Sequence, residues 1–203
     1  DNRDCGLSTH FSDAPVPDLR ALQNGQPVTL PYTLDDLVAD SVGLLDALGI
    51  KQANVAGASM GGAIAQLAAA NYPERVISLT SIMSSSGNPA LPAPTPAAAT
   101  ALFAPLPRQR DRESIVADSI ARYETLESPA YPTDRGRLRQ LFADEYERNF
   151  DPRGVARQLA ALIANGDRRA LLQTISAPSV VLHGAADQLI PLACGEDVAR
   201  NIP

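Results

Sequence analysis

At residues 57–62 the chain reads Gly57-Ala58-Ser59-Met60-Gly61-Gly62, a lone serine among small residues. Residues 52–56 before it suit a short buried strand, and residues 63–70 after it suit a helix. Strand, sharp turn and helix form the context that the G-x-S-x-G motif requires. The stretch therefore predicts a nucleophile elbow, a strained turn with Ser59 at its tip and with Gly57 and Gly61 making room for the strand and the helix. The alternative is an ordinary helix entry in which Ser59 is the N-cap.

The segment ahead of the elbow is expected to hold a loop and one helix. Residues 1–31 are polar and contain turn-forming Gly and Pro, so they predict a surface loop without a strand. Thr33 fits a helix N-cap with Asp36 three residues on. Apolar residues then recur at helical spacing until Gly49, which predicts an amphipathic helix that leads into the strand before Ser59.

Beyond the elbow helix the pattern returns to strands. Residues 75–83 are β-branched and apolar, as in a buried strand, and residues 179–183 predict a third strand. A last helix is expected from about Leu192 to Asn201. Strands that alternate with helices imply an α/β protein whose parallel sheet carries helices on both faces.

The chain between the second and third strands differs in composition. Residues 84–107 are rich in Pro, Ala and Ser and are typical of a linker, whereas residues 108–169 show three or four helical patterns. We interpret this stretch as an inserted helical lid. The domain prediction is therefore a first core part at residues 1–83, a lid at residues 84–169 and a second core part at residues 170–203.

Composition excludes several classes of protein. The 203 residues are 45% hydrophobic, enough for a full core, and the net charge of -6 disfavours a nucleic-acid partner. The longest basic run is Arg168-Arg169, and no apolar run is long enough for a membrane span. Cys5 and Cys194 predict free thiols. Neither a metal-ligand spacing nor a nucleotide-binding motif is present, so no cofactor is expected.

A serine nucleophile needs a base and an acid to orient that base. Asp187, four residues after His183 and just past the third strand, is the best candidate acid. Ser59, Ser84 and Asp187 all follow strand ends, so they are expected at one edge of the sheet. The only histidines are His10 and His183, and neither fits the chain order of serine, acid and histidine.

Three blocks of the sequence, taken together, resemble the α/β-hydrolase superfamily in its lid-bearing serine esterase branch. The blocks are Asp1-Asn2-Arg3-Asp4-Cys5-Gly6-Leu7-Ser8, similar to a D-x-R-x-x-G-x-S segment, then residues 57–62, and then His183-Gly184-x-x-Asp187-x-x-x-Pro191. The resemblance covers nearly the whole chain. The start of the first block and the length of the lid are similar to carboxyl methylesterases of the aclacinomycin methylesterase type.

This resemblance implies Ser59 as nucleophile, Asp187 as the acid and the backbone N–H of Met60 as one oxyanion donor. It also implies that the family's first strands and its His-Gly oxyanion loop would precede Asp1, and that its Gly-x-x-His segment would follow Pro203. The chain is therefore expected to be a fragment of a longer enzyme. On its own it is expected to have little esterase activity.

The resulting functional prediction is a hydrolase of small-molecule carboxylic esters, without a metal or other cofactor. Alternatives within the same fold are a C–C bond hydrolase, a cofactor-free haloperoxidase and an aminopeptidase. A different class, a non-catalytic binding module of this fold, is supported by the missing histidine. A homodimer through the lid or a sheet edge is compatible with the sequence, and a cytoplasmic location is expected, with a signal peptide ahead of Asp1 left open.

Overall fold

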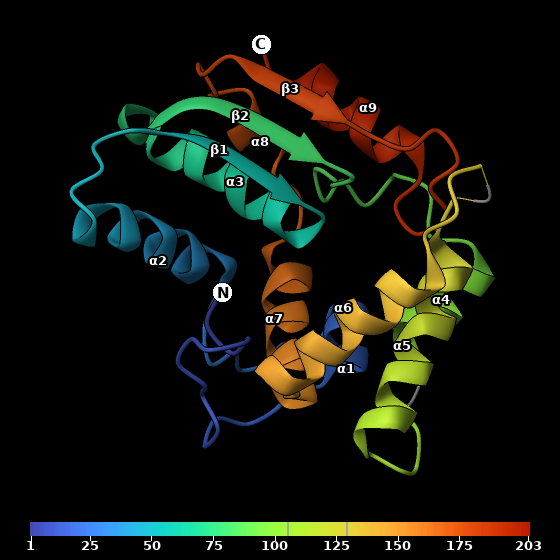
Figure 1. Ribbon diagram of the computed structural model, residues 1–203. Helices are drawn as coiled ribbons and strands as arrows, with labels where there is room; N and C mark the ends of the chain where they lie inside the picture. The colour runs from blue at the N-terminus through green and yellow to red at the C-terminus, as the bar shows by residue number, and fades with distance from the viewer. Residues whose placement is uncertain (105, 129) are drawn as a thin grey trace.

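The computed structural model describes residues 1–104, 106–128 and 130–203. The expected three strands are present as β1 (Ala53–Ala58), β2 (Val76–Ile82) and β3 (Ser179–Leu182). They form one parallel sheet in the order β1-β2-β3 (Figure 1). Ala58 is paired with Ile82, and Ile82 with Leu182, so all three strands end at the same edge. This register places the residues that follow each strand side by side.

The helices cover one face of this sheet, which corrects the expectation of helices on both faces. Figure 1 shows α3 (Met60–Asn71) beneath β1 and β2, while α9 (Leu192–Asn201) packs on β3 and the short α8 (Arg169–Leu172) lies against α3 and α9. Each strand lies next to the one before it in the chain, in the order β1-β2-β3. Because the connections between parallel strands are right-handed, connections that all run in this direction place their helices on the same face of the sheet. The opposite face leaves large apolar side chains about half exposed, namely Ile77, Val180 and Leu182.

The helix that precedes β1 forms as the sequence predicts. It is α2 (Leu34–Ala47), and Thr33 and Asp36 make a full capping box at its start. Its first two turns bury Leu34, Leu37 and Val38 against α3. The acidic first turn also complements the positive end of the helix dipole.

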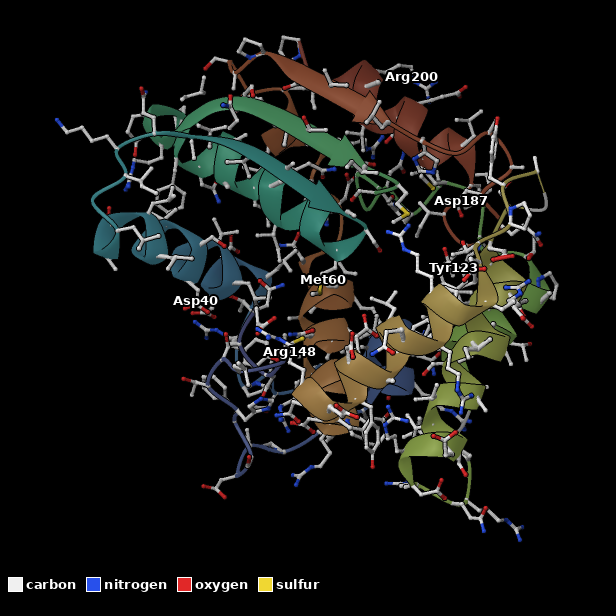
Figure 2. The ribbon with its side chains drawn as sticks, viewed as in Figure 1. Asp40, Met60, Tyr123, Arg148, Asp187 and Arg200 are labelled. Carbon is white, nitrogen blue, oxygen red and sulfur yellow. The ribbon has the colours of Figure 1, made fainter. Side chains whose placement is uncertain are left out.

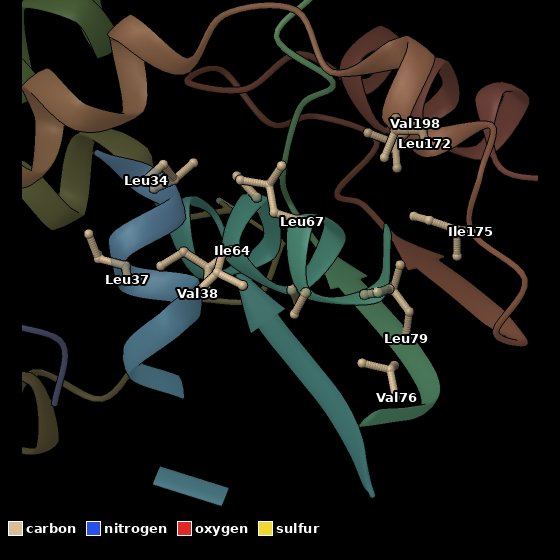
Figure 3. Close-up of a cluster of buried hydrophobic side chains, with 14 of the residues drawn as sticks. Leu34, Leu37, Val38, Ile64, Leu67, Val76, Leu79, Leu172, Ile175 and Val198 are labelled. Atoms are coloured by element: carbon tan, nitrogen blue, oxygen red, sulfur yellow. The ribbon is translucent and has the colours of Figure 1, made fainter. Parts of the chain in front are cut away.

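The hydrophobic core lies between the helices and the inner face of the sheet (Figure 3). Leu67 of α3 and Leu79 of β2 are each 1% exposed, and Val198 of α9 is fully buried. Burial of side chains of this size stabilises a fold by roughly 1.5–3 kcal/mol each. This core fixes α3 against the strand ends and so fixes the elbow at its amino end.

Two segments expected to be irregular contain helices. The loop over residues 1–31 includes the short α1 (Leu19–Gln23), capped by Asp18. The Pro- and Ala-rich stretch includes α4 (Pro96–Phe103), because Thr95 caps it and Pro96 stands at the first helical position, where a missing N–H costs nothing. The high proline content of this stretch led to its interpretation as a linker, so this helix was not predicted. A single 3-10 turn, η1 (Pro73–Arg75), connects α3 to β2.

The remaining helices between β2 and β3 confirm the expected helical patterns. They are α5 (Arg112–Leu126), α6 (Arg135–Arg148) and α7 (Pro152–Asn165). α5 packs against α4 and α6, whereas α7 packs against α1 and α2 and adds Ala161 to the main core. That residues 84–169 act as one lid remains a prediction. None of the helices within the described ranges has both the length and the apolar character to cross a membrane.

Candidate active site

Ser59 stands between β1 and α3 with a strained backbone. Its φ of 53° and ψ of −117° lie outside the regions that a residue with a Cβ normally occupies. Two hydrogen bonds hold it there: the Ser59 N–H donates to the Ile82 carbonyl at 2.9 Å, and the Ala63 N–H donates to the Ser59 carbonyl at 3.2 Å. Such strain costs about 1–3 kcal/mol and persists only where the surroundings enforce it. Ser59 is exposed at the tip of this turn.

The glycines around Ser59 have different roles from those expected. A Cβ on Gly57 would lie 2.0 Å from the Gly61 carbonyl oxygen, so Gly57 is required for the close approach of β1 and α3. A Cβ on Gly62 would lie 2.6 Å from Cβ of Ser84, so Gly62 is the second position that needs glycine. At Gly61 a Cβ would meet no heavy atom of the described residues within 4 Å, so the steric demand predicted there is wrong.

The amino end of α3 points its free N–H groups toward Ser59. No side chain caps this helix, so the N–H groups of its first turn, which begins at Met60, lack a capping acceptor within the described chain. The helix dipole adds a partial positive charge at the same end. Figure 2 shows Met60 where the start of α3 approaches the upper end of α7. An anionic oxygen bound near Ser59 would find donors in place there.

Asp187 lies in the loop between β3 and α9, on the same edge of the sheet as Ser59 (Figure 2). Its Oδ1 accepts hydrogen bonds from the N–H groups of Leu189 and Ile190, both at 2.9 Å. Its side chain is 18% exposed, and Oδ2 lies 3.8 Å from Nε2 of His183. One carboxylate oxygen therefore shapes the loop while the other has no hydrogen bond within the described residues.

His183 is committed to the structure of this loop. Its side chain is 3% exposed, and its Nε2 lies 2.6 Å from the Ile190 carbonyl oxygen. A carbonyl oxygen only accepts, so Nε2 carries the proton and Nδ1 is left without a partner in the described part of the chain. A Cβ on Gly195 would lie 2.4 Å from that Nδ1, which shows how closely α9 packs on the ring.

His10 lies in a separate polar cluster. Its Nδ1 is 3.1 Å from Asp151 and its Nε2 is 3.0 Å from the Gly6 carbonyl oxygen. The Gly6 carbonyl and then the Asp151 carboxylate raise the pKa of His10. Neither His10 nor His183 belongs to the described lining of the cavity beside Ser59.

That cavity has a volume of about 190 Å³ and lies at the strand ends. Most of its side chains are apolar. Its lining residues are Ser59, Met60, Ala63, Met83, Ser84, Ser85, Gly87, Leu162, Ile163, Gly166, Arg168 and Ile190. The structure thus brings the loop that contains Asp187 to the cavity through Ile190, while Asp187 itself is outside the described lining. Sequence reasoning missed Arg168, although Arg168-Arg169 stood out as the longest basic run.

The residues best placed to bind a metal ion already bind a positively charged side chain, that of Arg157. Asp4, His10 and Asp151 offer ligand atoms within 4.8 Å of one another. The guanidinium of Arg157 donates to both oxygens of Asp4, from Nε at 2.7 Å and from Nη2 at 2.8 Å. A divalent cation would have to displace or face that guanidinium, so the donor set does not fit a metal.

The Asp4 carboxylate is strongly stabilised in its charged form. Burial alone would raise its pKa, but hydrogen bonds from Arg157, from the Phe11 N–H and from Tyr32 hold the pKa at about 2. Asp4 and Arg157 side chains are both fully buried. The pair ties the beginning of the chain to α7.

The fold is that of a known family. A family model described as alpha/beta hydrolase fold matches residues 13–203, and the chain belongs to this family. Rhodomycin D methylesterase DnrP of Streptomyces peucetius is 26% identical over 192 residues, which cover 85% of this chain and 64% of that protein. The pimeloyl-[acyl-carrier protein] methyl ester esterase of Chromobacterium violaceum is 30% identical over 188 residues, which cover 89% of this chain and 68% of that protein.

A solved structure is similar over the whole chain. A hydrolase from Pseudomonas aeruginosa PA01 has a TM-score of 0.67 and 26% identity, with 100% of this chain and 66% of that chain covered. The relatives also include 3-oxoadipate enol-lactonase 2 of Acinetobacter baylyi, which is 30% identical over 174 residues that cover 85% of this chain and 60% of that protein. Another is the 2-hydroxy-6-oxononadienedioate/2-hydroxy-6-oxononatrienedioate hydrolase of Burkholderia vietnamiensis, 30% identical over 172 residues that cover 79% of this chain and 55% of that protein. The chain thus spans about two thirds of the length of the proteins that it matches.

Proposed function

We propose that the protein hydrolyses carboxylic esters of small molecules through an acyl-enzyme on Ser59. The observation that carries this proposal is an exposed serine held at a φ of 53°, beside an uncapped helix start and in the wall of a largely apolar cavity. Strain of this kind is costly and is typical of functional positions. The methyl esterases among the relatives support ester hydrolysis over the other reactions of the fold.

The proposed reaction needs a nucleophile, a base, an acid and an oxyanion donor, and the chain offers candidates for all but the base. A base removes the Ser59 proton as Oγ attacks the ester carbonyl, and the first-turn N–H of Met60 stabilises the resulting oxyanion. The C–O bond breaks, the alcohol leaves with the proton from the base, and water then releases the carboxylic acid by the same route. Asp187 is proposed as the acid that orients the base, through the carboxylate oxygen that the loop does not use.

The base is proposed to be a histidine outside these 203 residues. His183 is buried and donates to the Ile190 carbonyl, and His10 lies in the cluster with Asp151. Neither ring is among the described residues around the Ser59 cavity. Robust hydrolysis of p-nitrophenyl acetate by the 203-residue chain alone, lost in Ser59→Ala, would contradict an external base.

Methyl-ester hydrolysis by the full-length protein tests the function itself. We expect Ser59→Ala to abolish turnover, and an unchanged rate in Ser59→Ala would reject the proposal. The competing function is a non-catalytic binding module, favoured by the lack of a histidine in the described cavity wall. A module of that kind would bind a ligand at this cavity with no ester turnover at all.

A further inference from the structure

Arg168 is a buried cation in the wall of the Ser59 cavity. It lies in the turn between α7 and α8 and is 3% exposed. Its own backbone N–H donates to the Ser86 carbonyl at 2.8 Å, so the turn is fixed against the loop that follows β2. Because Ser59 lines the same cavity, a charge on Arg168 acts directly on whatever occupies it.

The hydrogen-bond partners of this guanidinium are all uncharged. The acceptors are Gln66 Oε1 at 3.4 Å, Asn165 Oδ1 at 2.9 Å, the Gly166 carbonyl at 3.1 Å and the Ser85 carbonyl at 2.6 Å. A guanidinium has five N–H bonds, and these contacts use four of them. The remaining hydrogen, on Nη2, has no acceptor within the described residues.

Arg168 forms no ion pair with a carboxylate of the described residues, although the charge of the adjacent Asp167 acts on it from a greater distance. Over residues 1–104, 106–128 and 130–203, no carboxylate oxygen lies within 4.0 Å of its nitrogens. Asp167 turns to Arg169, with Nη2–Oδ2 at 2.7 Å, and Asp197 accepts from the Ser86 hydroxyl at 2.5 Å. Burial lowers the pKa of Arg168 to about 10, which still leaves it protonated at neutral pH. A buried cation without a counter-ion is unfavourable unless another group supplies the opposite charge.

We propose that Arg168 supplies the counter-charge for a carboxylate on the substrate. The substrate class is then a half-ester of a dicarboxylic acid, or a lactone with a free carboxylate, and this assignment rests on the proposed ester hydrolysis. The apolar wall of Met60, Leu162 and Ile163 would hold the methylene chain between the ester at Ser59 and the carboxylate. Hydrogen bonds from arginine to a carboxylate are stronger than those to a neutral carbonyl group. The cavity should therefore prefer substrates with a carboxylate over neutral substrates.

A pair of esters tests this preference without any mutation. Monomethyl adipate and methyl hexanoate have the same methylene chain and the same leaving group, and they differ only in the terminal carboxylate. With the full-length protein we expect kcat/KM to be roughly tenfold to hundredfold higher for monomethyl adipate, the range for a hydrogen bond to a charged group. Equal values, or a preference for methyl hexanoate, would overturn the proposal.

Substitutions at Arg168 distinguish substrate recognition from a purely structural role. In Arg168→Met we expect the ratio of kcat/KM for monomethyl adipate to that for methyl hexanoate to fall roughly tenfold or more, mainly through a higher KM for monomethyl adipate. Arg168→Lys, which keeps the charge, should retain part of the preference. Arg200→Gln is the matched control, because it removes one exposed cation on α9. Equal losses for both esters in Arg168→Met and Arg168→Lys would show that Arg168 only clamps the two loops.

A binding measurement separates this proposal from the proposed reaction. Calorimetry on Ser59→Ala should give a lower Kd for monomethyl adipate than for methyl hexanoate, and addition of Arg168→Met should remove the difference. If the wild type hydrolyses neither ester and this difference is found, the proposed reaction fails while the carboxylate site stands. If both esters are hydrolysed without any difference in Kd, the carboxylate site fails alone.

Discussion

Gly57 and Gly61 approach so closely that a Cβ on the first would lie 2.0 Å from the carbonyl oxygen of the second. This contact joins the end of strand β1 to the first turn of helix α3 and leaves Ser59 between them. The two backbones could separate only by moving α3 away from the core that it shares with β2. The strained conformation of Ser59 is therefore a consequence of how strand and helix pack.

Gly57→Ala should destabilise the chain strongly, because the added methyl group must displace backbone. Overpacking of a tight site typically costs about 1–3 kcal/mol or more. Gly61→Ala is the matched control, since a Cβ there meets nothing within 4 Å among the described residues and alanine favours a helix. Urea unfolding of both variants measures the difference. Equal stability of Gly57→Ala and wild type would mean that β1 and α3 do not pack this closely.

Substitutions of Ser59 should expose the backbone strain. Glycine adopts a positive φ without a steric penalty, so Ser59→Gly should raise the free energy of unfolding by about 1 kcal/mol. Ser59→Ala removes the same hydroxyl but keeps the Cβ, so it should show no such gain. Thermal or urea unfolding of the two variants gives the comparison. If alanine and glycine are equally stabilising, the gain does not come from φ.

Asp187→Asn should separate the shape of the acid loop from its charge. Asparagine Oδ1 can accept the same two hydrogen bonds from Leu189 and Ile190, so unfolding should be little changed. Ester hydrolysis by the full-length protein should fall by about 10²–10⁴-fold if Asp187 orients the base. Asp187→Ala, by contrast, should lose both activity and stability. An active Asp187→Asn would assign the acid elsewhere.

The buried pair of Asp4 and Arg157 should contribute strongly to the stability of the fold. Asp4→Asn removes the carboxylate that pairs with the fully buried Arg157 guanidinium and leaves it only Asp151, at 3.5 Å, so the loss should be roughly 3 kcal/mol, at the low end for breaking a buried pair. Asp40→Asn is a useful comparison, because the Asp40 side chain is 47% exposed and a surface pair contributes less than about 1 kcal/mol. Similar losses in both variants, measured by urea unfolding at pH 7, would contradict this assignment.

The pH dependence follows from the lowered pKa of Asp4. Its pKa falls from 3.8 to about 2 on folding, so the ionised carboxylate stabilises the native state above pH 3.8. That contribution, about 2 kcal/mol, should be lost as the pH falls from 3.8 through 2. The free energies of unfolding of the wild type and Asp4→Asn should therefore become more similar as the pH falls across this range. A difference that is constant from pH 7 to pH 2 would mean that Asp4 does not titrate in this way.

Local patterns in the sequence were enough to predict most elements. Residues close together in the sequence indicate three of these elements: the helix that begins after the capping box at Thr33, the strand before Ser59 and the β-branched strand of residues 75–83. The α4 helix was missed because its cap at Thr95 is surrounded by prolines that suggest a linker. The bare sheet face was missed because it depends on the order of the strands, which periodicity does not encode.

In the candidate site, too, the residues within short motifs were predicted and those that depend on long-range contacts were not. Ser59 and the loop of Asp187 are marked by short motifs, so their positions could be read directly. Gly62 and Arg168 depend on contacts with Ser84 and Ser85, which are distant in sequence and meet only in the fold. The sequence therefore predicted the strained turn at Ser59 and missed the contacts that Gly62 and Arg168 make around it.

Covalent labelling of the full-length protein tests the central claim most directly. A fluorophosphonate reacts with an activated serine, and peptide mass spectrometry locates the adduct. We expect one adduct, on Ser59, together with its loss in Ser59→Ala and its strong reduction in Asp187→Asn. Absence of any adduct, or an adduct on another serine that persists in Ser59→Ala, would contradict Ser59 as the nucleophile.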